Sequence, residues 1–205
     1  MFHKPFKVKQ TFPLKPSEKK KLKQTLDKNF IDQPIKFDKN NKLSQQKIFT
    51  SSNVPFELFL ENDEPVLLES RSKSLIPTVP LVLKSPWLIK STNVVNIPHH
   101  VFEQLQNGSD LMASELVDQE NEFVANDFTQ LKNLNKKDII GIRSITETGV
   151  VNPILAIGRV IMTQAEIQQS ELKSGKFAEI ITIIGDELWN CAVLKNLPSD
   201  VEQAW

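Results

Sequence analysis

The side chains that could act as nucleophiles, bases or metal ligands are few in this sequence, and their spacing does not suit those roles. His99 and His100 are adjacent, so on a helix they would point about 100° apart and could not bind one metal ion from the same face. Cys191 has no neighbouring histidine or lysine that could activate it, since the nearest basic residue along the chain is Lys195. A small buried thiol is therefore its expected role, and we expect no metal and no cofactor.

Sequence motifs of the common enzyme classes are absent. The chain has no glycine-rich phosphate loop, no Gly-x-Ser-x-Gly nucleophile elbow and no His-Glu-x-x-His pair. Seven carboxylates lie between Lys90 and Lys132 without any lysine or arginine, but they lack the alternating spacing and turn glycine of a calcium loop. The sequence therefore predicts a protein that is not an enzyme, with a solvated acidic insertion at about residues 114–132.

Lysine is the residue type whose distribution points to a function. Residues 1–47 hold 13 lysines and 4 carboxylates, whereas the rest of the chain holds 12 basic and 21 acidic side chains, so a formal net charge of zero hides two oppositely charged parts. A block this basic commonly binds a polyanion, because each neutralised phosphate releases counterions, although a solubilising arm has the same composition. The candidate polyanion-binding residues are Lys7, Lys9, Lys15, Lys19, Lys20, Lys21 and Lys23.

Composition limits the class of protein further. A chain of 205 residues with 40% apolar side chains suits one large globular domain or two small ones. A single cysteine excludes an intrachain disulfide and favours a reducing compartment, so we expect a cytoplasmic protein. The sequence shows neither an apolar run of the length that a membrane helix needs nor an N-terminal signal peptide.

The first 90 residues predict a mixture of helix and strands. Ser17 is expected to cap a helix that ends before Pro34, with Leu22, Leu26 and Phe30 on its buried side. A polar linker is expected at residues 38–47. A hairpin is expected from residues 56–60 and 66–68 around an Asn-Asp turn.

Prolines divide the apolar segment at residues 75–89, where they allow only edge strands or extended segments. The segment is more apolar than a domain of about 90 residues should expose, so we expect it to dock on the second half of the chain. Trp87 is the predicted interdomain anchor, because a large aromatic side chain contributes much buried area. Base stacking by its indole is the alternative.

The second half predicts a strand-rich unit with short helices. A helix is expected to start at residues 96–98 and to stop at Asn107 and Gly108. Strands are expected at residues 138–145, 150–162 and 178–184. A capping box at Thr163 and Glu166 opens a second helix, which ends before Gly175. This pattern is typical of a small barrel-like domain.

Five segments of the chain resemble a known family. They lie at residues 1–9, 75–79, 107–112, 156–166 and 185–189, and include Asn-Gly-Ser-Asp-Leu-Met and Gly-Asp-Glu-Leu-Trp. In this order they resemble the N-terminal half of the eukaryotic translation initiation factor 2D (ligatin) family, which shares the region with the malignant T-cell amplified sequence proteins.

The resemblance implies an α+β fold in two parts. These are an N-terminal α+β (pre-PUA) domain over residues 1–90 and a PUA domain, a β pseudo-barrel, over residues 93–190. Residues 191–205 would be the C-terminal tail of a fragment, because the family carries further winged-helix-like and SUI-type domains. The PUA motif implies Gly108, Asp110, Leu111, Met112 and Gly158 as family positions, whereas residues 113–115 depart from the family's Pro-Gly turn.

The family also implies a function. Its members bind the small (40S) ribosomal subunit, deliver tRNA to the P site without GTP, and act in recycling and reinitiation. The expected protein is therefore a noncatalytic, monomeric ribosome- and RNA-binding module whose partners are rRNA and tRNA. Two alternatives are a protein-interaction adaptor that uses the acidic insertion, and an RNA-anchoring PUA module of an RNA-modifying system.

Overall fold

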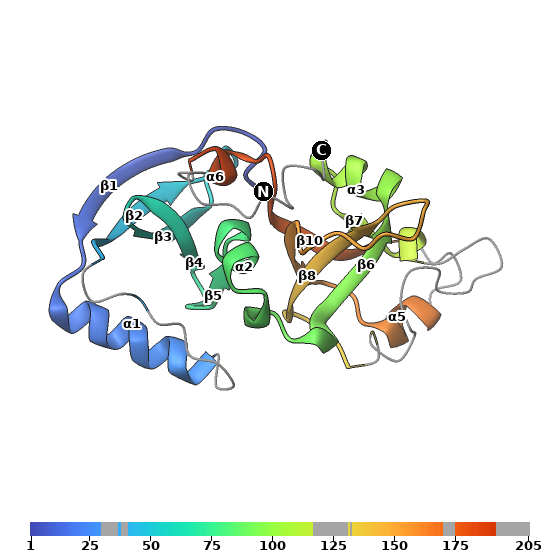
Figure 1. The fold of residues 1–205 in the computed structure, drawn as a ribbon, viewed down its shortest axis with the longest axis horizontal. Helices are drawn as coiled ribbons and strands as arrows, with labels where there is room; N and C mark the ends of the chain where they lie inside the picture. Colours follow the sequence, from blue (N-terminus) through green and yellow to red (C-terminus); the bar gives the residue numbers. More distant parts are fainter. Residues whose placement is uncertain (30–36, 38–40, 117–130, 132, 170–174, 192–205) are drawn as a thin grey trace.

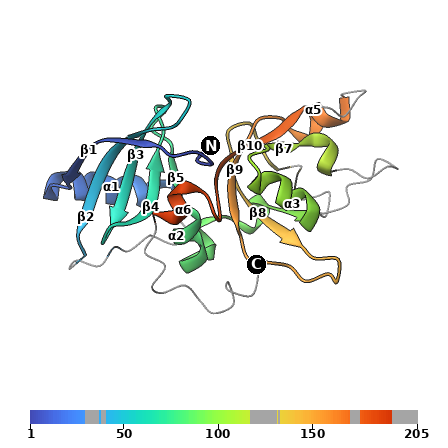
Figure 2. The ribbon, with the colours of Figure 1, turned by 90° about the horizontal axis from the view of Figure 1, so that it is seen from above.

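Two five-stranded sheets lie side by side in the computed structural model of this chain (Figures 1 and 2). Helices lie against both sheets, so the predicted α+β class is confirmed. The structure describes residues 1–29, 37, 41–116, 131, 133–169 and 175–191. Of the predicted acidic insertion, residues 117–130 and 132 lie outside the described part, as do Phe30 and the tail beyond residue 191.

The first sheet is an antiparallel meander in which each strand pairs with the next one along the chain. Its strands are β1 (Lys7–Pro13), β2 (Leu43–Phe49), β3 (Pro55–Glu61), β4 (Glu64–Glu69) and β5 (Leu75–Pro77). Asn62 and Asp63 join β3 to β4 with φ angles of 50° and 67°, the positive pair that a tight two-residue hairpin turn requires. The predicted hairpin is therefore confirmed.

Helix α1 (Pro16–Asn29) connects β1 to β2 and begins two residues earlier than a cap at Ser17 predicts. Ser17 is not its cap, because the backbone N–H of Lys15 donates to Glu18 Oε2 at 2.8 Å and Pro16 occupies the first helical position. Leu22 and Leu26 are buried as expected. The predicted polar linker is too long, since β2 already begins at Leu43.

The proline-rich segment contains a helix, although its prolines predict only edge strands or extended segments. Helix α2 (Val79–Lys84) follows β5, and Pro80 lies in its first turn, where no intrahelical partner for a backbone N–H is lost. The Thr78 hydroxyl donates to the carbonyl of Pro65 at 2.8 Å and fixes the start of the helix against β4. The prediction of extended segments alone was wrong beyond Pro77.

The second sheet has the order β6-β8-β9-β10-β7, with β6 parallel to β8 and the other pairs antiparallel. Its strands are β6 (Val94–Pro98), β7 (Leu111–Met112), β8 (Ile139–Ile145), β9 (Ala156–Val160) and β10 (Lys176–Ile183). Its helices are α3 (His99–Gln106), α5 (Gln164–Gln169) and α6 (Glu187–Asn190). Short 3₁₀ turns lie at Pro86–Leu88, Ser91–Asn93 and Ala113–Leu116.

In the second half of the chain, two predicted elements have different bounds and one predicted capping motif is present. Helix α3 begins at His99 rather than at residues 96–98, because those residues pair with β8 as part of β6. Strand β9 is shorter than predicted, since Pro153 lies in the expected strand and β9 starts only at Ala156. The capping box is confirmed, because the backbone N–H of Thr163 donates to Glu166 Oε2 at 2.9 Å.

One apolar core runs through both sheets. It includes Ile48, Leu58, Leu68 and Ile76 from the first sheet and Ile97, Ile142, Ile157 and Ile180 from the second. Phe2 belongs to this core, is fully buried, and packs edge-on against Phe6 and Phe56. The backbone N–H of Glu187, at the start of α6, donates to the carbonyl of Phe2 at 3.0 Å. Both ends of the described chain therefore meet where the sheets join.

Trp87 is not the interdomain anchor. Its side chain is 52% exposed, whereas Ile89, two residues later, is 6% exposed and belongs to the shared core. The residues that fill the predicted role are Phe2 and Trp189, which the chain brings in from its two ends. Pro86 begins the 3₁₀ turn that directs Leu88 and Ile89 inward and leaves the indole outside.

Asp186 caps α6 at the same junction. It is only 3% exposed, and its carboxylate accepts from the backbone N–H groups of Trp189 at 2.8 Å and Ile183 at 3.0 Å. Burial raises the pKa of Asp186 to about 6, even though these hydrogen bonds favour the charged form. The junction thus contains a carboxyl group that titrates far above its ordinary range.

Replacing Phe2 by alanine should uncouple the two halves of the core. Phe→Ala changes at buried sites cost about 3–5 kcal/mol, so the free energy of unfolding should fall by that amount in urea denaturation. Phe12→Ala is the matched control, because Phe12 is 43% exposed and its loss should cost less than about 1 kcal/mol. Equal losses for the two variants would show that Phe2 does not join the two sheets.

Asp186→Asn should flatten the dependence of stability on pH. Since the pKa of about 6 lies above the ordinary value of 3.8, the folded chain binds more protons than the unfolded chain between about pH 4 and pH 6. The contribution of Asp186 to stability therefore falls as pH rises through that range, by up to about 3 kcal/mol. Urea denaturation at pH 4, 5, 6 and 7 measures the difference between the two proteins, and parallel curves would contradict the assignment.

Candidate nucleic-acid interface

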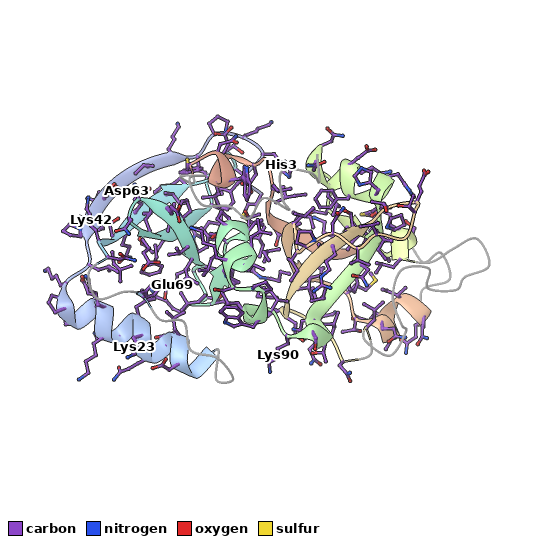
Figure 3. The ribbon with its side chains drawn as sticks, in the orientation of Figure 1. His3, Lys23, Lys42, Asp63, Glu69 and Lys90 are labelled. Atoms are coloured by element: carbon purple, nitrogen blue, oxygen red, sulfur yellow. The ribbon has the colours of Figure 1, made fainter. Side chains whose placement is uncertain are left out.

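Seven exposed or half-exposed lysines occupy β1 and α1, and we call this surface the basic face. It comprises Lys7 and Lys9 on β1 and Lys15, Lys19, Lys20, Lys21 and Lys23 at and along α1. Lys19 is half-buried, the other six are exposed, and Figure 3 shows Lys23 extending from α1 into solvent. Leu22 and Leu26 hold the opposite side of the helix in the core. The predicted residues are thus brought together on two consecutive elements.

The charges of the basic face are not neutralised by its surroundings. Within the described part of the chain, none of the seven lysines has a carboxylate within ion-pair distance, whereas Lys42, Lys73 and Lys84 each have one. Lys19 and Lys23 are one helical turn apart, so they repel each other. Lysines in the first turns are also repelled by the positive end of the helix dipole. The arrangement is unfavourable for the isolated helix and favourable for an anionic ligand.

Strand β1 adds apolar surface to the basic face. It is the edge strand of the first sheet and is exposed along its whole length, including Val8 and Phe12 at 48% and 43%. Lys9 Nζ lies 5.9 Å from the centre of the Phe49 ring, a cation–π distance that orients this ammonium group. A hollow of about 330 Å³ lies where β1 meets α1, and is lined by Phe12, Pro13, Leu14, Lys15, Glu18 and Gln45.

Asp110 of the PUA motif has a structural role. Its Oδ1 accepts from the backbone N–H of Ile180 at 2.8 Å, and its Oδ2 lies 2.5 Å from Lys176 Nζ. The hydrogen bond to Asp110 raises the pKa of Lys176, so this lysine stays charged beside the carboxylate. Asp110 therefore ties the start of β7 to β10 and has no free oxygen aimed at a ligand.

The other motif residues also serve the fold. Gly108 ends α3 with a φ of +97° and lies against the His3 ring, which Figure 3 places between the two sheets. At Gly158 a Cβ atom would come within 3.3 Å of the Glu179 carbonyl, so glycine allows β9 and β10 to approach closely. Leu111 is fully buried, and Met112 is the one exposed side chain of the five at 37%.

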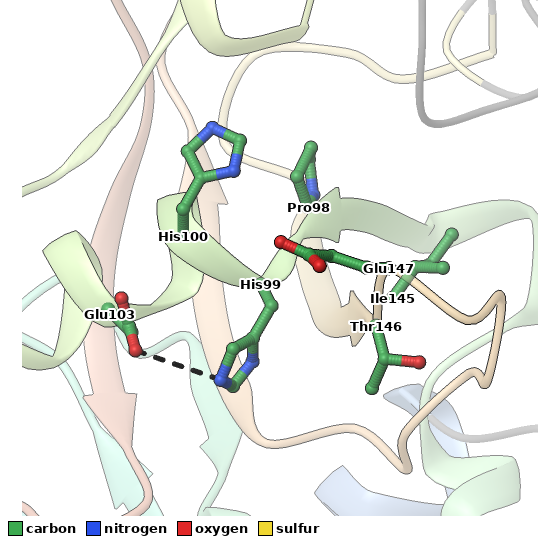
Figure 4. Close-up of a pocket in the computed structure, with 7 residues that line it drawn as sticks. All are labelled: Pro98, His99, His100, Glu103, Ile145, Thr146 and Glu147. Atoms are coloured by element: carbon green, nitrogen blue, oxygen red, sulfur yellow. Dashed lines mark ion pairs between the residues drawn. The ribbon is translucent and has the colours of Figure 1, made fainter.

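A groove that the sequence did not reveal lies beside α3. It has a volume of about 430 Å³ and is lined by Pro98, His99, His100, Glu103, Ile145, Thr146 and Glu147 (Figure 4). His99 Nε2 lies 3.8 Å from Glu103 Oε1, while the His100 ring points to the other side, as the spacing of the two residues predicted. Glu103 and Glu147 make the groove a poor site for phosphate. Its residues come from the end of β6 and α3 and from the end of β8 and the loop after it, which are far apart in sequence.

Cys191 differs from its expected state. It is exposed rather than buried and ends α6. Partial burial of the sulfur, together with Glu187 and Asp186, raises the pKa of its thiol, which disfavours the thiolate. The described residues contain no group of three or more potential metal ligands of the His, Cys, Asp and Glu types. No helix in the described part of the chain is long and apolar enough to cross a membrane.

This chain is similar in sequence and in fold to known proteins. Residues 2–86 match the family described as the Pre-PUA-like domain. A hypothetical protein from the hyperthermophilic archaeon Pyrococcus horikoshii OT3 has a similar structure, with a TM-score of 0.54, 17% identity, and coverage of 90% of this chain and 100% of that one. A comparison with curated proteins gave no match.

A second solved structure with a similar fold is described as a PUA domain. It is a PUA domain from Aeropyrum pernix K1, solved as a tartrate complex, and it matches with a TM-score of 0.52, 18% identity and coverage of 90% of each chain. The similarity extends well beyond residues 2–86, so it includes the second sheet. The first 86 residues thus resemble a Pre-PUA-like domain, and the chain shares its overall fold with a solved PUA-domain protein.

Proposed function

We propose that this chain is the RNA-binding module of a noncatalytic, cytoplasmic translation factor that binds the small ribosomal subunit. In this role it supports GTP-independent delivery of tRNA to the P site, reinitiation, and recycling after termination. The Pre-PUA-like match and the PUA-type fold support the general class. The resemblance of five ordered segments to the initiation factor 2D family supports the specific role.

The basic face is the observation that carries the proposal. Its seven lysines have no carboxylate partner within the described residues, and those on the first turns of α1 oppose the helix dipole. A bound phosphate backbone supplies the negative charge that these lysines lack and offsets their repulsion by the helix dipole. It also releases counterions as it binds. Because lysine is a point charge on a flexible stem, the face recognises phosphates and not particular bases.

The second sheet has a different role in this proposal. Asp110 and Lys176 neutralise each other, and Glu103 and Glu147 line the groove beside α3. These groups do not favour a phosphate backbone. The shared core fixes the second sheet relative to the basic face, so a contact made by one part orients the other. We infer that the first sheet and α1 supply most of the affinity for RNA.

Charge reversal within the basic face should weaken binding to purified small subunits. The triple variant Lys19→Glu, Lys20→Glu and Lys23→Glu removes three phosphate contacts of about 1 kcal/mol each, so the affinity should fall by a factor of roughly 100. The slope of the logarithm of affinity against the logarithm of salt concentration should also become shallower by about one unit for each lost contact.

The matched control reverses three lysines that already have carboxylate partners. Lys42→Glu, Lys73→Glu and Lys136→Glu change the net charge equally but lie outside the basic face. Equal losses for the two triples would show that only net charge matters. Unchanged affinity of the first triple with its circular dichroism intact would overturn the proposal, and binding without any salt dependence would favour a protein-interaction adaptor instead.

A further inference from the structure

Trp87 is the most exposed of the aromatic side chains in the described part of the chain. Its indole is 52% exposed, compared with 43% for Phe12, whereas Phe56, Phe102, Phe177 and Trp189 are each at most 5% exposed. We propose that Trp87 is a stacking platform for an unpaired nucleobase, so that the module binds single-stranded RNA in preference to duplex. This inference rests on the proposed RNA-binding function and adds the class of RNA that the module takes.

The backbone under the indole is held from both sides. Pro86–Leu88 forms a 3₁₀ turn, in which the N–H of Leu88 donates to the Ser85 carbonyl at 3.1 Å. Leu88 is buried in the core between α1 and the first sheet, and Ile89 is buried in the core shared by both sheets. The backbone that carries the exposed ring is therefore held in one conformation. Binding a base to this ring then costs little backbone entropy.

The sequence around Trp87 is cationic and polar. Residues 79–102 contain Lys84 and Lys90 and no carboxylate. Lys84 is paired with Glu64, while exposed Lys90 has no ion-pair partner among the described residues. In Figure 3 Lys90 and Lys23 lie on the same side of the molecule.

These surroundings favour a nucleobase over a protein partner. A protein interface needs a contiguous apolar patch with the aromatic side chain near its centre. Here Lys84, Ser91 and Thr92 are exposed near Trp87 in the sequence, and its apolar neighbours Leu88 and Ile89 are buried. An exposed ring three residues along the chain from the exposed Lys90 suits one base and its adjoining phosphate, the pattern by which single strands are bound without sequence preference.

The test compares two RNA probes by fluorescence anisotropy with the full chain. The probes are a single strand of about 12 nucleotides and a blunt duplex of the same sequence. Trp87→Ala should weaken binding of the single strand about tenfold and change binding of the duplex less than about twofold, while Trp87→Phe should fall between. Saturating single strand should quench indole fluorescence in the wild type, and Trp87→Phe should remove most of that quenching.

The control variant is Val150→Ala, because Val150 is 58% exposed and lies in the loop between β8 and β9. It should bind both probes as the wild type does. Equal affinity of wild type and Trp87→Ala for the single strand would overturn the inference, and so would equal losses for both probes. Weaker binding to intact subunits without weaker binding to the single strand would identify a protein contact and overturn it as well.

The result also separates this inference from the proposed function. If the wild type binds both probes and only the triple lysine variant loses affinity, the proposed function stands and the stacking role of Trp87 is wrong. If the wild type binds neither probe nor small-subunit RNA, the proposed function itself fails.

Discussion

Burial of Phe2 where the two sheets join is the constraint on which the rest of the structure depends. The residue belongs to a core with members from both sheets, and its carbonyl accepts from the first residue of α6. The start of the chain is therefore clamped between the first sheet and the end of the second. Strand β1 and α1 continue directly from this clamp, so the position of the basic face relative to the second sheet is set by packing and not by a linker.

The basic face differs in its electrostatics from the rest of the fold. The lysines of β1 and α1 have no carboxylate partner in the described part of the chain, whereas the second sheet pairs Lys176 with Asp110 and Arg159 with Glu179. The basic face thus keeps its charge available to a ligand, whereas Lys42, Lys73 and Lys84 of the first half are paired within the fold, as are these two basic residues of the second sheet. A net charge of zero for the whole chain therefore says little about either surface.

Local signals were predictable from the sequence, and contacts between distant segments were not. The turn at Asn62 and Asp63, the capping box at Thr163 and the end of α3 at Gly108 each depend on a few neighbouring residues, and all three are confirmed. The lysines could be named because their exposure follows from their side-chain type. The groove beside α3 and the partners of Asp110 depend on how the chain returns to the second sheet. The sequence order of apolar residues could not show that Phe2, and not Trp87, fills the junction.

Strand β1 has a consequence for how the protein behaves at high concentration. An exposed edge strand presents unpaired N–H and C=O groups that can pair with the same edge of another molecule. Val8 and Phe12 would favour such a contact, but Lys7 and Lys9 lie on the same strand and repel the corresponding lysines of a second copy. The two lysines therefore also keep the edge from self-association. In the proposed complex RNA would neutralise these lysines, and the bound RNA itself would then have to block the edge.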